Sequence, residues 1–262
     1  MRRLTTLSRL AALSASAVLL AACSGTPTYN PSTYGYKIDQ EKLDAQPVRT
    51  VVLAHVNLGT QSRNYLEKEA PRIDAQVAAY LKDNGFKVLP QREFEQHWKT
   101  AVRAFGDPVD PTSGKVNMKT FAQIMHRVRD QMTKSNEIDA FIFTDLVELD
   151  VSFSGGLKHL ARWDGVTRAP TMQGPGDGVS MDFDWSMLAS VVSLQVTIYD
   201  KNLDPLFSSR GGMDATEAID SRSSKGRFIR RRNILENDSN IMEGIQLAFY
   251  PFIAWEDWPG NP

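Results

Sequence analysis

Histidine and cysteine, which often act as metal ligands, bases or nucleophiles, number only four and one in this 262-residue sequence, and their spacing matches no known catalytic or metal-binding motif. A single cysteine excludes an internal disulfide framework and every cysteine-rich zinc site. His159, with Arg162 and Asp164 close by in the sequence, is the best acid–base candidate, although a structural histidine is the commoner outcome. No H-E-x-x-H, H-x-H or H-x3-H pair occurs among the four histidines, which are His55, His97, His126 and His159. We therefore predict no metal site and assign no catalytic residue.

The strongest charge feature is a basic segment near the C-terminus. It places six basic residues within eleven positions: Arg222, Lys225, Arg227, Arg230, Arg231 and Arg232. Cationic groups at this density favour an anionic partner, such as lipid headgroups, lipopolysaccharide phosphates, cell-wall polymer or an acidic protein patch. The alternative is a solvated loop or helix start that only keeps the protein soluble. The basic segment is a candidate partner or anion contact.

The residues before the single cysteine predict its role. Three arginines (Arg2, Arg3 and Arg9) precede an apolar stretch of 13 residues over 10–22, and Leu20-Ala21-Ala22-Cys23 ends it. This stretch is too short to span a bilayer, which takes about 20 helical residues, and is typical of a secretory signal peptide. Its end resembles the lipobox of bacterial lipoproteins, whose cysteine receives a diacylglyceryl group and becomes the N-terminus. We predict a signal peptide over residues 1–22 and a lipid on Cys23, with no other cofactor.

Removal of the signal peptide changes the charge balance. The whole chain has 30 basic and 31 acidic residues, a net charge of −1, and residues 1–22 contain three arginines and no acid. The mature chain therefore carries a net charge of −4, against which the basic segment stands out. Near-neutrality excludes a general nucleic-acid binder, and the periplasm supplies neither ATP nor nucleic acid. Ser24 follows the lipidated cysteine, where aspartate would favour the inner membrane, so we expect the outer membrane with the body facing the periplasm.

Hydrophobic periodicity predicts the elements that position these residues. Residues 23–47, small, polar and punctuated by prolines, are expected to be the lipidated cysteine and a flexible tether. Residues 48–262 are expected to form one α/β domain, a sandwich with a mixed sheet and helices packed on it, in the order β-α-β-α-α-β-β-β-β-α.

The strand predicted over 138–153 is the most informative element. It begins as a continuous apolar run and ends in alternation, which predicts burial on both faces at first and on one face later. Residues 157–168 are expected to pair back with it. A capping box at Asn240 and Glu243 predicts the start of the last helix, and Asp200 to Pro205 predict a hairpin turn.

Three stretches carry a resemblance to a known family. They are Leu81 to Val88, Ile138 to Phe143, and Leu194 to Asp200, each in the predicted strand or helix context. Together they resemble a group of envelope lipoproteins that includes activators of peptidoglycan synthases, the curli-secretion lipoprotein and related exporter-ring lipoproteins. The resemblance implies an α/β body like that of anticodon-binding domains and a role in envelope assembly or export.

The sequence therefore predicts a non-enzymatic, membrane-anchored lipoprotein that acts by protein–protein interaction in envelope assembly or export. Its expected partners are the membrane, through the lipid, and an unidentified envelope protein, and a homo-oligomer stays open. A periplasmic hydrolase acting on cell wall or polysaccharide is the alternative, because the carboxylate pairs of glycosidases are spaced in three dimensions and leave no sequence motif.

Overall fold

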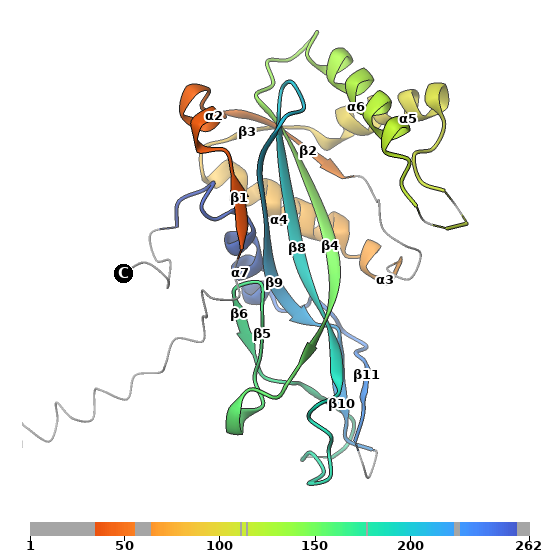
Figure 1. The fold of residues 1–262 in the computed structure, drawn as a ribbon, viewed down its shortest axis with the longest axis vertical. Coiled ribbons are helices and arrows are strands. Elements are labelled where there is room, and N and C mark those ends of the chain that lie inside the picture. Colours follow the sequence, from red (N-terminus) through yellow and green to blue (C-terminus); the bar gives the residue numbers. More distant parts are fainter. Residues whose placement is uncertain are drawn as a thin grey trace, which may run out of the picture.

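The computed structural model of the protein describes residues 35–55, 64–110, 112–113, 115–176, 178–222 and 226–255. The predicted signal peptide, Cys23 and Lys225 lie outside these residues. A six-stranded sheet runs along the long axis of the molecule, with strand order β1-β9-β8-β4-β2-β3 (Figure 1). Its strands are β1 (Tyr36–Ile38), β2 (Thr50–His55), β3 (Lys87–Leu89), β4 (Ala140–Ser152), β8 (Leu188–Asp200) and β9 (Pro205–Ala215).

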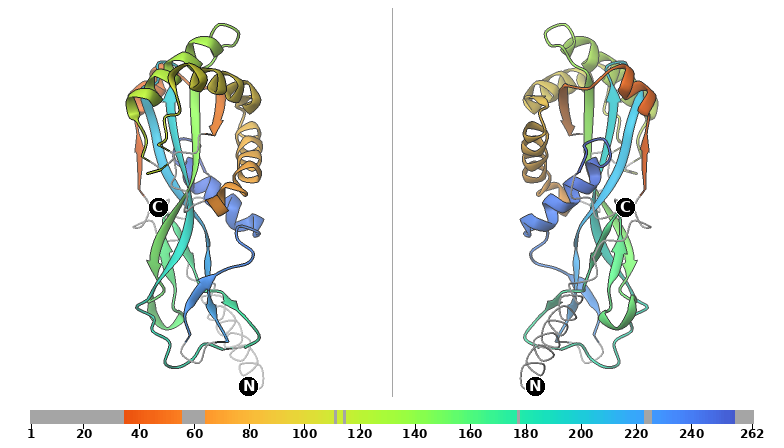
Figure 2. Two further views of the ribbon diagram at one scale, coloured as in Figure 1. Left: turned by 90° about the vertical axis from the view of Figure 1, so that its right-hand side faces the viewer. Right: turned by 90° about the vertical axis from the view of Figure 1, so that its left-hand side faces the viewer.

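The sheet is mixed, as the sequence predicts. Strand β2 pairs in parallel with β3 and β4, whereas the pairs β4–β8, β8–β9 and β9–β1 are antiparallel. Four helices cover its faces: α4 (Ala70–Asp83) and α7 (Asp238–Phe249) lie on one face, and α5 (Gln91–Phe105) and α6 (Met118–Met132) lie on the other (Figure 2). The predicted α/β class is therefore confirmed.

Alternate residues of β2 show why the strand needs helices on both sides. Val51 and Leu53 contribute to the core beneath α4 and α7, while Val52 and Ala54 face α5 and α6. All four side chains are at most 2% exposed. A strand buried on both faces is typical of the parallel part of an α/β sheet.

Strand β4 confirms the prediction that one strand changes its environment along its length. Its first residues are buried on both faces, since Ile142 faces α4 and α7 and Phe141 faces α5 and α6. Its last residues, Leu149 and Val151, pack on a separate apolar cluster that also contains Phe153. The strand therefore joins the helix-covered part of the molecule to a distal part built mainly from short strands.

The distal part lies at the end of the long axis away from α5 and α6 (Figure 1). It contains the helical turn η4 (Gly156–Lys158) and the strands β5 (Ala161–Trp163), β6 (Val166–Arg168), β7 (Met172–Gln173), β10 (Glu217–Asp220) and β11 (Phe228–Arg230). The predicted pairing of 157–168 with the long strand is wrong: β5 and β6 pair with each other. Asp164 and Gly165 both have positive φ, as a tight two-residue hairpin requires.

Two boundaries also differ from the predicted ones. The segment predicted as tether contains β1 and the short helix α2 (Gln40–Ala45), because Ile38 and Leu43 pack against the main core. The capping box at Asn240 is wrong: Asn237 caps α7 and accepts hydrogen bonds from the N–H groups of Ser239 (3.0 Å) and Asn240 (3.2 Å). The helix starts earlier because this asparagine satisfies its first free N–H groups.

Helix α7 approaches the sheet so closely that only glycine fits at the contact. A Cβ atom added to Gly211 on β9 would lie 1.9 Å from the carbonyl oxygen of Gly244 and 2.7 Å from the backbone nitrogen of Ala248. Both of these atoms belong to the backbone of α7. The close approach buries Ile241, Ile245 and Phe249 completely in the main core.

Candidate interaction surfaces

The basic segment is the first candidate surface, and the structure distributes its side chains along β10, β11 and the loop before α7. Arg222 and Arg227 both lie near the carboxylate of Asp220, at 2.8 Å and 3.8 Å. Asp220 itself is 4% exposed and comes from the last position of β10. The hydrogen bond from Arg222 holds the pKa of this carboxyl below its usual range. These two guanidinium groups therefore share one internal counter-ion.

Arg230 contacts a polar cluster centred on Glu148 of β4. Its Nη1 atom lies 2.8 Å from Oε1 of Glu148, and its guanidinium carbon lies 4.0 Å from the centre of the Tyr65 ring. The Tyr65 hydroxyl donates a hydrogen bond to Glu148, and the Thr216 hydroxyl donates a second at 3.3 Å. Arg230 thus combines an ion pair with a cation–π contact, and both draw it toward the body of the protein.

Arg231 is the most enclosed of the arginines in the segment. Its Nη1 atom donates to Oδ1 of Asp214 and to the carbonyl oxygen of Ala215, both at 2.7 Å. Its side chain is 19% exposed and that of Asp214 is 10% exposed. The neighbouring Arg232 has no ion pair within the described part of the chain, and its side chain faces solvent. Among the described arginines of the segment, Arg232 is therefore the one without an internal counter-ion that would compete with an external anion.

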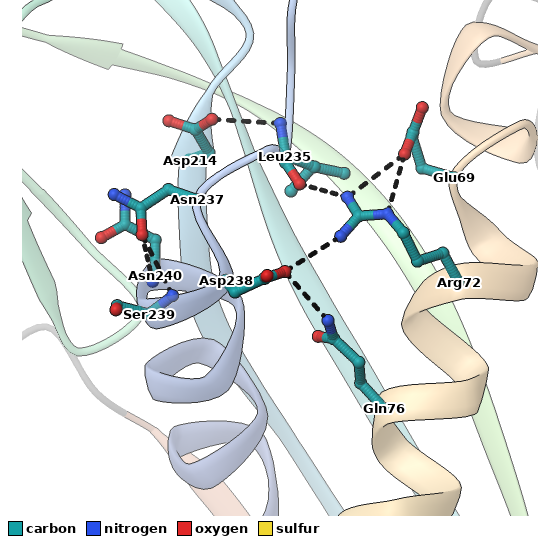
Figure 3. A network of polar contacts seen from close by, with 9 residues as sticks. All are labelled: Glu69, Arg72, Gln76, Asp214, Leu235, Asn237, Asp238, Ser239 and Asn240. Atoms are coloured by element: carbon teal, nitrogen blue, oxygen red, sulfur yellow. Dashed lines mark hydrogen bonds and ion pairs between the residues drawn. The ribbon is translucent and has the colours of Figure 1, made fainter.

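The loop after the basic segment is held between β9 and α4 (Figure 3). Asp214 accepts a hydrogen bond from the N–H of Leu235 at 3.1 Å, and the carbonyl of Leu235 accepts one from Arg72 on α4. Arg72 also lies 3.3 Å from both Glu69 and Asp238. A shallow polar depression beside this network is lined by Arg72, Arg232, Glu236 and Asp238, among others. Charges of both signs line it, so it has no selectivity for an anion.

Sequence reasoning identified the arginines but missed the carboxylates that neutralise them. Glu148, Asp214 and Asp220 lie on three different strands, and Glu148 is 82 positions from Arg230 in the chain. Only Asp220, two residues before Arg222, leaves a local signal in the sequence. At least part of the basic segment therefore forms internal ion pairs. Arg231, the most enclosed of its arginines, has the clearest structural role.

A second surface, which we call the α6 groove, lies between α6 and the turn that joins β8 to β9. Its apolar floor is formed by Phe121, Met125, Phe143, Tyr199 and Leu203, and it encloses a volume of about 330 Å³. The rings of Phe121 and Phe143 lie 6.4 Å apart, and those of Phe143 and Tyr199 lie 5.7 Å apart in an edge-to-face arrangement. Aromatic packing therefore fixes the shape of the floor.

The rim of the α6 groove is more polar and accessible. His126, Asn202 and Asp204 line it together with Met118, which is 66% exposed. The turn is rigid because one carboxylate oxygen of Asp200 accepts N–H bonds from Asn202 (2.7 Å) and Asp204 (2.9 Å). This confirms the predicted hairpin turn. An apolar floor with a polar rim is the usual composition of a protein-binding patch.

The acid–base candidate His159 has a different environment from a catalytic histidine. Its ring stacks on Trp185 with centroids 3.4 Å apart, and its Nδ1 atom is buried without a hydrogen-bond partner among the described residues. It occupies the left-handed region at φ +49° after η4. Within the ranges described, no three His, Cys, Asp or Glu side chains lie together as metal ligands would. The geometry gives His159 a packing role in the distal part.

Alkaline pH tests the environment of two tyrosines. Burial raises the pKa of Tyr80 to about 12, and burial followed by the hydrogen bond to Glu148 raises that of Tyr65 to about 12. A tyrosine in the unfolded chain ionises near pH 10, whereas these two stay neutral in the folded protein until about pH 12. Their contribution to the free energy of unfolding is therefore fully present below pH 10 and is lost as the pH rises to 12. We expect the urea midpoint to fall over this range, and to fall less steeply in Tyr80→Phe.

The measurement is urea unfolding by circular dichroism at constant ionic strength. Tyr80→Phe is expected to match the parent protein at pH 7, because both then carry an uncharged ring, and to be the more stable of the two at pH 11. Parallel curves from pH 10 to 12 would show that Tyr80 ionises equally well in the folded protein.

Comparison of the chain with protein-family models, with curated proteins and with solved structures found no match in any of the three. Among the residues described, none of the helices combines the length and apolar character needed to cross a bilayer.

Proposed function

We propose that this protein is a lipid-anchored, periplasm-facing lipoprotein of the outer membrane that binds an apolar segment of an envelope protein in the α6 groove. The lipobox at Cys23 supports the anchor. The α6 groove is the observation that supports the binding function, because it combines an apolar floor with an accessible polar rim. The proposed role is non-enzymatic contact in envelope assembly or export.

The composition of the α6 groove favours a protein segment as its occupant. Three aromatic rings form the apolar floor with the buried Met125, and the flexible side chain of Met118 is exposed on the rim, where a methionine adjusts to partners of different shape. Phe121 and Leu203 are only partly buried, so a partner's side chain would remove further apolar area from water. Aromatic and methionine residues are enriched at the centres of protein interfaces.

The basic segment takes a smaller part in the proposal than the sequence alone suggests. Arg222, Arg227, Arg230 and Arg231 already have internal counter-ions, whereas the solvent-facing Arg232 has none within the described residues. An acidic patch on the partner would therefore contact Arg232 first. Lys225 lies outside the described residues and stays a candidate contact.

Site-specific crosslinking in living cells tests the α6 groove. A photoreactive benzophenone residue is placed at Met118, whose exposed side chain stands on the rim, and the crosslinked products are identified by mass spectrometry. We expect a discrete crosslink to an envelope protein. Ala122→Glu, which adds a charge to the wall of the groove, is expected to lower the crosslink yield about tenfold, since an unpaired charge at an interface is costly.

Ala79→Glu is the matched control, because Ala79 is an exposed alanine on α4, away from the groove. It is expected to leave the crosslink unchanged. Equal crosslink yields in Ala122→Glu and Ala79→Glu, or no protein crosslinked from position 118, would contradict the proposed binding site.

A further inference from the structure

Exposed apolar side chains concentrate at the distal end of the molecule. Nine large apolar side chains are exposed among the described residues, and five of them lie between residues 157 and 188: Leu157, Met172, Met181, Met187 and Leu188. Leu157 on η4 and Met181 in the loop before β8 are fully exposed, and Leu188 is 59% exposed. Exposed apolar residues that cluster in this way mark a contact surface. We call these five residues the distal tip.

The distal tip is supported by a packed platform. Phe183 lies against both Trp185 (4.7 Å between ring centres) and Phe228 (5.4 Å), and His159 stacks on Trp185. Phe183 is 4% exposed, so the loop that carries Met181 is pinned at a residue two positions away. The apolar side chains of the distal tip therefore project from an ordered base.

The direction of β1 shows from which side the chain that carries the predicted anchor enters the sheet. Strand β9 runs toward the distal end, and β1 is antiparallel to it, with Tyr36 opposite Ser209 (Figure 1). The chain before Tyr36 consequently enters the sheet from the distal side.

The length of chain before β1 is sufficient to bring the anchor level with the distal tip. The thirteen residues 23–35 span at most about 45 Å. From the level of Tyr36 to the distal tip the sheet advances about 26 Å, because Ser209 pairs with both Tyr36 and Val196, and Leu188 lies eight positions before Val196 on β8. A lipid on Cys23 and the distal tip can therefore reach one membrane surface together.

We propose that the distal tip docks on the lipid bilayer that holds the anchor, so that the body stands end-on with the α6 groove facing away from the membrane. This inference rests on the lipid anchor of the proposed function. Leu157 and Met181 would enter the boundary between headgroups and acyl chains, and Trp185, which packs on His159 and Phe183, is of a residue type enriched at that boundary.

The charges of the distal end indicate that apolar contact, and not attraction to anionic lipid, holds the tip. Exposed Lys158 and Arg162 are balanced by exposed Asp182 and Asp184. Arg222 and Arg227 already share Asp220. Docking is therefore expected in neutral lipid, with little dependence on salt.

The experiment places a thiol-reactive, environment-sensitive fluorophore on the lipidated full-length mature protein in phosphatidylcholine vesicles. Lipid occupies the thiol of Cys23, so Leu157→Cys, Met181→Cys or Met118→Cys provides a single labelling site. At positions 157 and 181 we expect a blue shift, quenching by spin-labelled lipid and loss of most iodide quenching. Position 118, exposed on α6 at the opposite end, is the matched control and is expected to stay open to iodide.

Each outcome separates the tip from the anchor. If the protein floats with the vesicles but iodide quenches the labels at 157 and 181 as strongly as the label at 118, the docking of the tip is overturned and the anchor is not. Protein that fails to float, with an unmodified Cys23 in the mass spectrum, would overturn the anchor itself. If iodide quenching at the tip is lost only after another envelope protein is added, the tip binds a protein and the proposed docking on lipid is wrong.

Discussion

Replacing Gly211 by alanine is expected to lower the free energy of unfolding by about 3 kcal/mol, because the new methyl group overlaps the backbone of α7. The clash, at 1.9 Å from the carbonyl oxygen of Gly244, involves no flexible side chain that might rotate away. Relief requires α7 to move off the sheet, and Ile245 and Phe249 would then lose packing that leaves them 0% exposed.

Chemical denaturation of purified variants measures this effect. Gly178→Ala is the control, because a Cβ there meets nothing within 4 Å and its φ is not in the left-handed region; its effect is expected within about 0.5 kcal/mol. Gly244→Ala should cost less than Gly211→Ala: a Cβ there would lie 2.5 Å from Cγ of Met213 and 2.9 Å from the carbonyl oxygen of Gly212, both longer than the 1.9 Å contact at Gly211, and alanine gains about 1 kcal/mol in helix propensity. Equal stability of Gly211→Ala and Gly178→Ala would show that α7 does not pack as described.

Asp214→Ala is expected to cost about 3–5 kcal/mol, the usual penalty for removing one partner of an enclosed ion pair. The carboxylate holds Arg231 at 2.7 Å and the N–H of Leu235 at 3.1 Å, so its loss leaves a guanidinium unpaired and frees the loop before α7. Denaturation of Asp214→Ala, Arg231→Ala and the double variant measures the coupling. We expect the double variant to be more stable than the sum of the single effects predicts.

Arg232→Ala provides the matched control within the same segment. Its guanidinium has no ion pair in the described ranges, so its removal should leave the free energy of unfolding unchanged within about 0.5 kcal/mol. Strictly additive effects of Asp214→Ala and Arg231→Ala would argue against the ion pair. Because Arg231→Ala also destabilises the fold, reduced recovery of a partner by this variant would not identify a contact. Reduced recovery by Arg232→Ala, which keeps the fold intact, would indicate that Arg232 contacts the partner.

Hydrophobic periodicity predicts well those helices and strands whose own residue pattern determines which side chains are buried. The run Ala140 to Phe143 and the alternation from Val147 onward correctly predicted a strand that leaves the helix-covered core. Asn117 begins α6 through hydrogen bonds to N–H groups two and three residues away. In each case the determining contacts are local or periodic, which makes them visible in one sequence.

Features that depend on distant contacts could not be predicted in this way. Three-residue β1 is a strand only because β9 offers an unpaired edge, and its own sequence carries no period. The basic segment predicted a contact for an external anion, yet Glu148 and Asp214 reach it from other strands. The α6 groove combines residues of α6 and β4 with residues 199–204, which follow at least 56 positions later in the chain, so no sequence pattern marks it.

The edge position of β1 also decides how the protein responds to mechanical load. A pull on the chain that precedes Tyr36 enters the body through three residue pairs between β1 and β9. A pull directed toward the distal end acts parallel to β1. The hydrogen bonds between β1 and β9 are then loaded in shear, all at the same time, and do not break one after another. The first structure to yield is then β1 with α2, while β9 stays paired with β8. Residues 36–45 would then be pulled out of the fold before the rest of the sheet is strained.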